Sequence, residues 1–161
     1  MAMTRPRAAR PLGIAILSAC ASLAGAQPTF APALNVDLSA MHATNRGTLV
    51  RDIVVGQGMT VGTGTVVALR YMGWLPDGTP VDSTAASDRP LTFVVGQHAV
   101  IAGWEDGVVG MRVGGQRQLV VPPKRAYGGK GTGPIPPNAT LVFTITLVGA
   151  RPATDAELRR P

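Results

Sequence analysis

Cysteine is almost absent from this chain of 161 residues, and the single one, Cys20, lies near the N-terminus. The remainder of the chain therefore has no disulfide and no thiol nucleophile. Histidine is nearly as scarce, since only His42 and His98 are present. Neither has a Cys or carboxylate cluster close to it in the sequence, so we expect no metal site.

The motifs of cofactor-dependent and covalent catalysis are missing too. Gly128-Gly129-Lys130-Gly131 has neither the upstream glycine spacing nor the Ser/Thr after Lys of a phosphate loop. Gly56-Gln57-Gly58 and Gly62-Thr63-Gly64 lack the third glycine of a dinucleotide site. No Gly-x-Ser-x-Gly elbow occurs, and Asp82 and Asp88 are more typical of carboxylates that flank a surface turn than of a catalytic pair. We expect no cofactor.

Charge is also sparse, at 15% of residues, although the formal net charge is +6. Arg5, Arg7 and Arg10 fall within the first ten residues, where there is no acidic residue. Without these three, twelve basic and nine acidic residues remain, which leaves a net charge of +3 and no basic run. This distribution indicates a mildly basic solvated surface and argues against nucleic-acid binding.

The N-terminus has the pattern of an export signal over residues 1–26. The basic segment precedes an apolar run, 12–23, that is too short and too rich in small residues to span a bilayer, and Ala24-Gly25-Ala26 offers a cleavage site before Gln27. A second interpretation stays open. Leu17-Ser18-Ala19-Cys20 resembles a lipobox, in which Cys20 would be lipidated and become the first mature residue. The expected contact with a membrane is limited to such a lipid anchor.

The remaining chain divides into an expected linker at 27–47, a folded domain at 48–150 and a flexible tail at 151–161. The domain contains six strand-like segments, at 49–55, 65–71, 81–84, 90–96, 116–121 and 140–148. The last has the clearest alternation, with Leu141, Phe143, Ile145 and Leu147 on one face. Only one helix is indicated, so hairpins fit better than βαβ units. We predict an α+β fold with a curved antiparallel sheet of five to six strands wrapped around one short helix.

The helix is predicted around Trp104, between residues 100 and 108. Ile101, Trp104 and Val108 share one face at helical spacing, and Glu105 and Asp106 are expected to face water. Trp104 is the natural anchor of this short element, because burial of an indole removes a large apolar area from water.

Two glycines, Gly103 and Gly107, interrupt this helix. Each costs about 1 kcal/mol relative to Ala in a helix interior. A helix of this length with two glycines must be stabilised by packing.

A long stretch without strand periodicity, 122–139, contains Tyr127 and Ile135 among glycines and prolines. Loops of this length in compact domains are usually functional or disordered. Together with the strands and the helix, it would supply an apolar concavity formed by Tyr71, Phe93, Val100, Ile101, Trp104, Tyr127 and Phe143, with Asp82 at its edge. The alternative is that these residues form only the core, which explains Phe93 but not the charge of Asp82.

Five segments in order resemble the FKBP-type peptidyl-prolyl cis/trans isomerases, particularly the exported bacterial single-domain forms. They are Leu69-Arg70-Tyr71-Met72-Gly73, Asp77-Gly78-x-x-Val81-Asp82-Ser83, Val100-Ile101-x-Gly103-Trp104-Glu105-x-Gly107-Val108, Ala126-Tyr127-Gly128 and Ile135-Pro136-Pro137-Asn138-Ala139-Thr140-Leu141-Val142-Phe143. The resemblance covers about residues 49–148 and implies a prolyl pocket whose floor is the tryptophan.

The resemblance also implies roles for individual residues. Catalytic roles would belong to Tyr71, Asp82, Ile101 and Tyr127. The substrate-binding residues would be Val81, Leu91, Phe93, Val100, Trp104, Ile135 and Phe143. Three positions depart from the family. Where this chain has Val81, the family usually has Phe. Where it has Leu91 the family often has an aromatic residue, and where it has Ser87 some members have a basic residue. The flap after Tyr127 is also one residue shorter, so Ile135 is an approximate match.

The expected function is acceleration of X-Pro bond rotation in exported, partly folded polypeptides in the periplasm or cell envelope, without a covalent intermediate. Macrolide immunosuppressants are further expected ligands by family resemblance. The alternative is a non-catalytic holdase or binding module on the same fold, because Val81 and Leu91 make the pocket less aromatic.

Overall fold

One curved antiparallel sheet organises the molecule, for which the computed structural model describes residues 28–159. Its longest strands, β3 (Thr65–Trp74) and β7 (Leu141–Pro152), pair along their length. The strand order is β1-β2-β6-β7-β3-β4, and β5 also pairs with β3. The other strands are β1 (His42–Ala43), β2 (Leu49–Val54), β4 (Pro80–Ser83), β5 (Leu91–Val94) and β6 (Gln116–Val121). Among the described residues the sheet thus has seven strands, and the one beyond the predicted six is β1.

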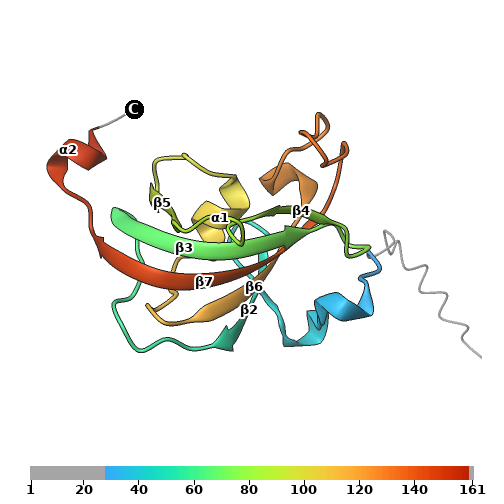
Figure 1. Cartoon of the computed structure of the whole chain (residues 1–161), viewed down its shortest axis with the longest axis horizontal. Helices are drawn as coiled ribbons and strands as arrows, with labels where there is room; N and C mark the ends of the chain where they lie inside the picture. Colours follow the sequence, from blue (N-terminus) through green and yellow to red (C-terminus); the bar gives the residue numbers. More distant parts are fainter. Residues whose placement is uncertain (1–27, 160–161) are drawn as a thin grey trace, which may run out of the picture.

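Helix α1 (Ala102–Gly107) lies across the concave face of this sheet (Figure 1). Trp104 and Val108 point into the main core, as their helical spacing predicts. From β7 the core receives Leu141, Phe143, Ile145 and Leu147, all at most 4% exposed. The predicted α+β architecture, a curved sheet around one short helix, is confirmed.

The glycines of α1 permit close packing against β6. An added Cβ at Gly103 would lie 2.3 Å from Cγ1 of Val121, and one at Gly107 would lie 2.3 Å from Cδ2 of Leu119. Both distances are far below van der Waals contact, so any larger residue would force the helix away from the sheet. The glycines that weaken the isolated helix therefore allow the packing that stabilises it.

Arg117 of β6 satisfies the C-terminal end of α1. Its guanidinium donates to the carbonyl oxygens of Gly107 and Val109, each at 2.9 Å, and makes a two-bond ion pair with Asp52 on β2. Carbonyl groups at the end of a helix have no partner within it, so a buried cation there is favourable. The position of α1 is thus fixed from the sheet as well as by packing.

Glu105 is buried, contrary to the prediction that it faces water. Its Oε2 accepts a hydrogen bond of 2.5 Å from the backbone N–H of Gly96, in the loop that follows β5. Asp106 is also mostly covered, because it pairs with Arg125. Helical periodicity places both acids away from Trp104, but it does not reveal the two loops that cover this side of the helix.

The segment expected to be a linker, 27–47, is described from residue 28 and packs against the sheet. It contains two 3₁₀ turns, η1 (Pro32–Leu34) and η2 (Leu38–Ala40), followed by β1. Leu34 packs with Val120 and Val142 on the face opposite α1, and its carbonyl oxygen accepts a 2.7 Å hydrogen bond from Gln118. Apolar residues spaced without a regular period can thus cover a sheet, which explains the difference from the expected linker.

The tail expected at 151–161 begins as the last two residues of β7 and continues as a short helix, α2 (Asp155–Leu158). A capping box joins Thr154 and Glu157, and Arg151 pairs with the same Glu157 carboxylate at 2.6 Å. Gln97 donates a 2.7 Å hydrogen bond to the carbonyl oxygen of Glu157. Local capping and these contacts give order to a segment that sequence polarity suggested was frayed.

The export signal expected at 1–26, including Cys20, lies outside the described residues. Within residues 28–159, no helix combines the length and the apolar character needed to cross a membrane.

Candidate functional site

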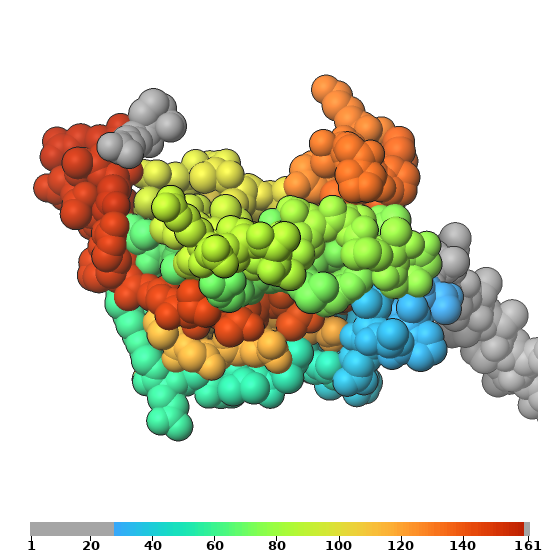
Figure 2. Space-filling model, in the orientation of Figure 1, coloured from blue at the N-terminus to red at the C-terminus, as the bar shows by residue number. Residues whose placement is uncertain are grey.

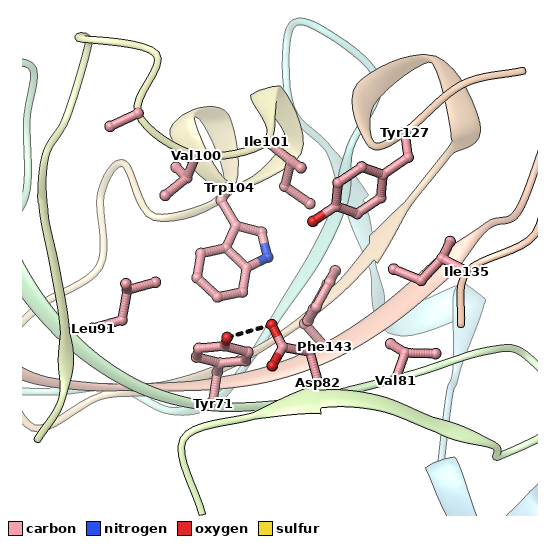
Figure 3. Close-up of a pocket in the computed structure, with 11 residues that line it drawn as sticks. Tyr71, Val81, Asp82, Leu91, Val100, Ile101, Trp104, Tyr127, Ile135 and Phe143 are labelled. Atoms are coloured by element: carbon pink, nitrogen blue, oxygen red, sulfur yellow. Dashed lines mark hydrogen bonds between the residues drawn. The ribbon is translucent and has the colours of Figure 1, made fainter. Parts of the chain in front are cut away.

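A cavity of about 190 Å³ opens between α1, β3, β4 and the loop after β6 (Figure 3). This volume is small beside the ~300–1,000 Å³ typical of sites for drug-sized ligands, so it suits one ring or side chain of a larger ligand. Its lining consists of Tyr71, Val81, Asp82, Leu91, Ala99, Val100, Ile101, Trp104, Tyr127, Ile135 and Phe143.

Three aromatic rings form the base of the cavity. The indole of Trp104 is 4% exposed and meets Tyr71 and Phe143 edge to face, with centroid distances of 4.6 and 5.1 Å. Such pairs add about 0.5–1.5 kcal/mol beyond the burial of their area. The three rings therefore hold one another in place and present a preformed apolar surface.

The sheet register places the site residues in a row. Gly73 on β3 lies opposite Asp82 on β4 and opposite Phe143 on β7. A Cβ at Gly73 would lie 2.5 Å from Cε1 of the Phe143 ring. The absence of a side chain at Gly73 thus lets Phe143 turn into the cavity, beside the strand that carries Asp82.

The hydroxyl of Tyr71 donates a 2.6 Å hydrogen bond to Oδ2 of Asp82 (Figure 3). Burial, and then this hydrogen bond to a carboxylate, raises the pKa of Tyr71 well above its ordinary value. Tyr71 therefore stays a neutral donor at physiological pH. Its bond fixes one oxygen of the Asp82 carboxylate at the edge of the cavity.

Two further polar groups lie at the cavity. Ile101 is the N-cap residue of α1, and its backbone N–H donates no hydrogen bond to any of the described residues, although its carbonyl oxygen accepts two. The hydroxyl of Tyr127 points into the cavity from the side across from Tyr71 and Asp82, and this residue is 40% exposed (Figure 3). Both groups are donors that a carbonyl oxygen of a ligand can use.

Tyr127 and Ile135 belong to a flap, residues 127–138, that follows the 3₁₀ turn η3 (Pro123–Arg125). The backbone N–H of Asn138 donates a 2.8 Å hydrogen bond to the carbonyl oxygen of Gly128, and this bond joins the two ends of the flap. Ile135 is 7% exposed and joins the core while also lining the cavity. In Figure 2 the flap (orange) projects from the molecule, and the surface between it and the C-terminal end (red) is hollowed.

The structure brings together all but one of the expected site residues. The exception is Phe93, which lies in the core on β5, opposite Val67 of β3, and does not line the cavity. The alternation along β5 correctly predicts that Phe93 points to the inner face of the sheet. The cavity, however, lies farther along that face, where Leu91 of the same strand lines it. Conversely, Ala99 lines the cavity without having been expected, and only its position next to Val100 could have indicated it.

The arrangement suits binding and orientation better than proton transfer or metal chemistry. Within residues 28–159, no three His, Cys, Asp or Glu side chains lie together so that they could hold a metal ion. The titratable groups at the cavity are a tyrosine whose raised pKa keeps it protonated, an exposed tyrosine and one carboxylate. What the site offers is an apolar base with a few donors around it.

Residues 58–148 match the family model of the FKBP-type peptidyl-prolyl cis-trans isomerases. This match covers more than half of the chain, and the fold and the aromatic pocket agree with it. The chain therefore belongs to the family of FKBP-type peptidyl-prolyl cis-trans isomerases.

Individual proteins show the same similarity. The FK506-binding protein of Neisseria meningitidis serogroup B is 40% identical over 103 residues, which are 63% of this chain and 94% of that protein. FK506-binding protein 4 of Gibberella zeae is 42% identical over 103 residues, and the chain spans only 21% of its length. The crystal structure of a peptidyl-prolyl cis-trans isomerase from Pseudomonas syringae pv. tomato has 33% identity and a TM-score of 0.61, covering 69% of this chain and 80% of that one.

Proposed function

We propose that the protein accelerates cis/trans rotation of X-Pro bonds in exported, partly folded polypeptides. The preformed cavity with Trp104 at its base carries this proposal, together with the family membership. A proline ring of the substrate would lie on the indole, and its preceding amide would lie beside Asp82. Domain limits near residues 48 and 150, with an export signal at 1–26, belong to the same proposal.

The physical problem is the partial double bond of the amide. Rotation meets a barrier of about 18–20 kcal/mol and takes tens to hundreds of seconds without a catalyst. In the twisted transition state the nitrogen lone pair is no longer shared with the carbonyl, so the amide is less polar. An apolar cavity therefore destabilises the planar amide relative to the twisted one, and no proton or covalent bond needs to change partners.

The polar groups around the cavity would supply orientation. The free N–H of Ile101 and the hydroxyl of Tyr127 would each bind a substrate carbonyl oxygen and hold the residues on both sides of the bond. The Asp82 carboxylate, fixed by Tyr71 at 2.6 Å, would act electrostatically near the rotating carbonyl group.

A protease-coupled assay on short X-Pro peptides, with X varied, tests the proposal. We expect the isomerisation rate to rise in proportion to enzyme concentration, and Tyr127→Phe to lower kcat/KM. Arg112→Met is a matched surface control, because the hydrogen bonds of the Arg112 side chain within residues 28–159 go to the carbonyl oxygens of Gln57 and Gly58, and Arg112 does not line the cavity. A rate equal to the uncatalysed one would eliminate the enzymatic proposal.

A second candidate function is a holdase that binds unfolded chains with little catalysis. Val81 and Leu91 favour it, because aliphatic side chains at the mouth of the cavity contact a proline ring less extensively than aromatic ones. Suppressed aggregation of a denatured protein, without acceleration of peptide isomerisation, would support this candidate over the first.

Val81 and Leu91 also affect the binding of macrolides. We propose macrolide binding on the basis of the family, and we expect these two residues to weaken it.

We also propose that the protein acts in the periplasm or cell envelope, on the basis of residues 1–26. Intact-mass measurement of protein from the cell envelope distinguishes the two cleavages. A chain that starts at Gln27 supports the soluble form, and an acylated chain that starts at Cys20 supports the lipid-anchored form. Unprocessed protein in the cytosol would contradict both.

A further inference from the structure

We infer that Arg125 is a positioning residue that holds the flap at its working distance from α1, an inference that rests on the proposed isomerase function. Arg125 is the last residue of η3, two residues before Tyr127. It does not line the cavity, so it would act on the substrate only through the groups that it places.

The guanidinium of Arg125 joins η3 to both ends of the short helix α1. Its Nη2 donates to the carbonyl oxygen of Ala102 at 3.2 Å and pairs with the carboxylate of Asp106. Ala102 directly follows Ile101, whose free N–H lies at the cavity. One side chain thus connects points one residue from Ile101 and two residues from Tyr127, the two expected carbonyl-binding groups.

The burial of this contact makes it stronger than an ordinary surface ion pair. The side chains of Arg125 and Asp106 are 21% and 12% exposed, so solvent screens their attraction only in part. Arg46 also approaches Asp106, at 3.8 Å, but its side chain is 64% exposed and contributes less. The backbone of Arg125 also lies close to α1. Its carbonyl oxygen would be 3.3 Å from a Cβ added at Gly103.

The backbone hydrogen bonds of the flap fix its shape, and among the described residues none of them joins it to α1. The amide of Gly128 bonds to the carbonyl oxygen of Pro123 at 2.9 Å, and Asn138 bonds to Gly128, so these hydrogen bonds stay within η3 and the flap. Ala126 and Ile135 pack against the core. Among the described residues, the polar link from η3 to α1 is therefore that of Arg125.

Loss of this link should loosen binding more than it slows rotation. Ile101 and Tyr127 would bind carbonyl oxygens in the planar and twisted states alike, so their misplacement weakens both states similarly. For Arg125→Met we expect KM to rise about threefold to tenfold, with kcat within about twofold. Arg125→Lys keeps the charge for Asp106 but not the planar fork, and should restore part of the affinity.

Kinetics on short X-Pro peptides and ¹H–¹⁵N spectra of the full chain test the inference together. Arg125→Met should shift the amide resonances of Ile101 and Gly128, and combining it with Asp106→Asn should add little further to KM. Arg112→Met, which removes a guanidinium with two backbone contacts elsewhere, should change neither KM nor these resonances.

Unchanged KM and unchanged amide resonances in Arg125→Met, with only a lower Tm, would overturn the inference and leave Arg125 a structural residue. If the wild-type protein lacks isomerase activity, the proposed function fails by itself. The spectra then decide whether Arg125 controls the placement of the flap, since the resonances of Ile101 and Gly128 report it without substrate.

Discussion

Replacement of Gly103 by alanine should destabilise the protein, although helix propensity alone predicts the reverse. In an exposed helix interior the change would stabilise by about 1 kcal/mol. Here the new methyl group would lie 2.3 and 3.0 Å from the two γ-carbons of Val121 and 3.3 Å from the carbonyl oxygen of Arg125. Val121 is fully buried, so it cannot turn away into solvent. Overpacking costs about 1–3 kcal/mol, and contacts as short as these, with two neighbours that must move, place this change in the upper part of that range, above the gain of about 1 kcal/mol.

We therefore expect Gly103→Ala to lower the free energy of unfolding by about 1–2 kcal/mol, measured by urea titration, and Tm by about 4–8 °C. Gly62→Ala is the matched control, since an added Cβ there meets no atom within 4 Å and its φ is not left-handed. It should be neutral or stabilise by up to about 1 kcal/mol through the unfolded chain.

A double-mutant cycle with Val121→Ala isolates the contact. Val121→Ala alone should cost about 2–3 kcal/mol through lost burial and a cavity, but in the Gly103→Ala background the new methyl group occupies part of that space. The two changes should therefore couple favourably by at least about 1 kcal/mol. A Gly103→Ala protein as stable as the wild type, or strict additivity in the cycle, would refute the packing explanation of this glycine.

Four other expectations follow from the site and the C-terminal helix. Tyr127→Phe should lower kcat/KM about threefold to tenfold with Tm unchanged, the cost of one hydrogen bond; no loss would mean that the hydroxyl binds no substrate group. Asp82→Asn should cost at most about a hundredfold in kcat/KM, and complete loss in a folded protein would show that Asp82 is a chemical catalyst. Trp104→Leu should reduce both kcat/KM and Tm, because the indole serves the core and the cavity; a loss of one without the other contradicts this. The hydrogen bond from the Arg151 guanidinium, and to a smaller extent those from Thr154, lower the pKa of Glu157 to about 2. The ionised Glu157 carboxylate therefore stabilises α2 fully above about pH 4.5, and this stabilisation is lost as the pH falls towards 2. Amide shifts of α2 in Glu157→Gln should lose this pH dependence, and an unaltered titration would exclude Glu157 as its source.

Local patterns in the sequence were sufficient for the fold and for most of the pocket. The alternation of Leu141, Phe143, Ile145 and Leu147 predicted the inner face of β7, because successive side chains of a strand point to opposite faces. The helical spacing of Trp104 and Val108 likewise predicted their burial. The family resemblance then indicated the other cavity residues, which lie on β3, β4 and β5, at the start of α1 and in the flap.

Contacts between segments remote in the sequence determine three features that local patterns do not predict. Glu105 is buried because Gly96, nine residues earlier, supplies an N–H for its carboxylate. Phe93 shares the inner face of the sheet with Tyr71 but lies beyond the end of the cavity. The expected linker covered residues 27–47, yet residues within it, such as Leu34, pack on Val120 and Val142 on the opposite face of the sheet. In each case the partner comes from another segment, whose proximity depends on how the whole chain folds.

The sequence by itself determined which apolar side chains of β7 and of the helix face the core, because that information is periodic and local. It also supplied the chemistry of the site, an aromatic and aliphatic set with one carboxylate and no nucleophile. Only the tertiary structure decided the distances that make these residues a site. The strand register places Gly73 opposite Phe143, and the glycines of α1 let Trp104 approach the sheet. Both features depend on steric fit between segments that are remote in the sequence, so the sequence pattern alone does not contain them.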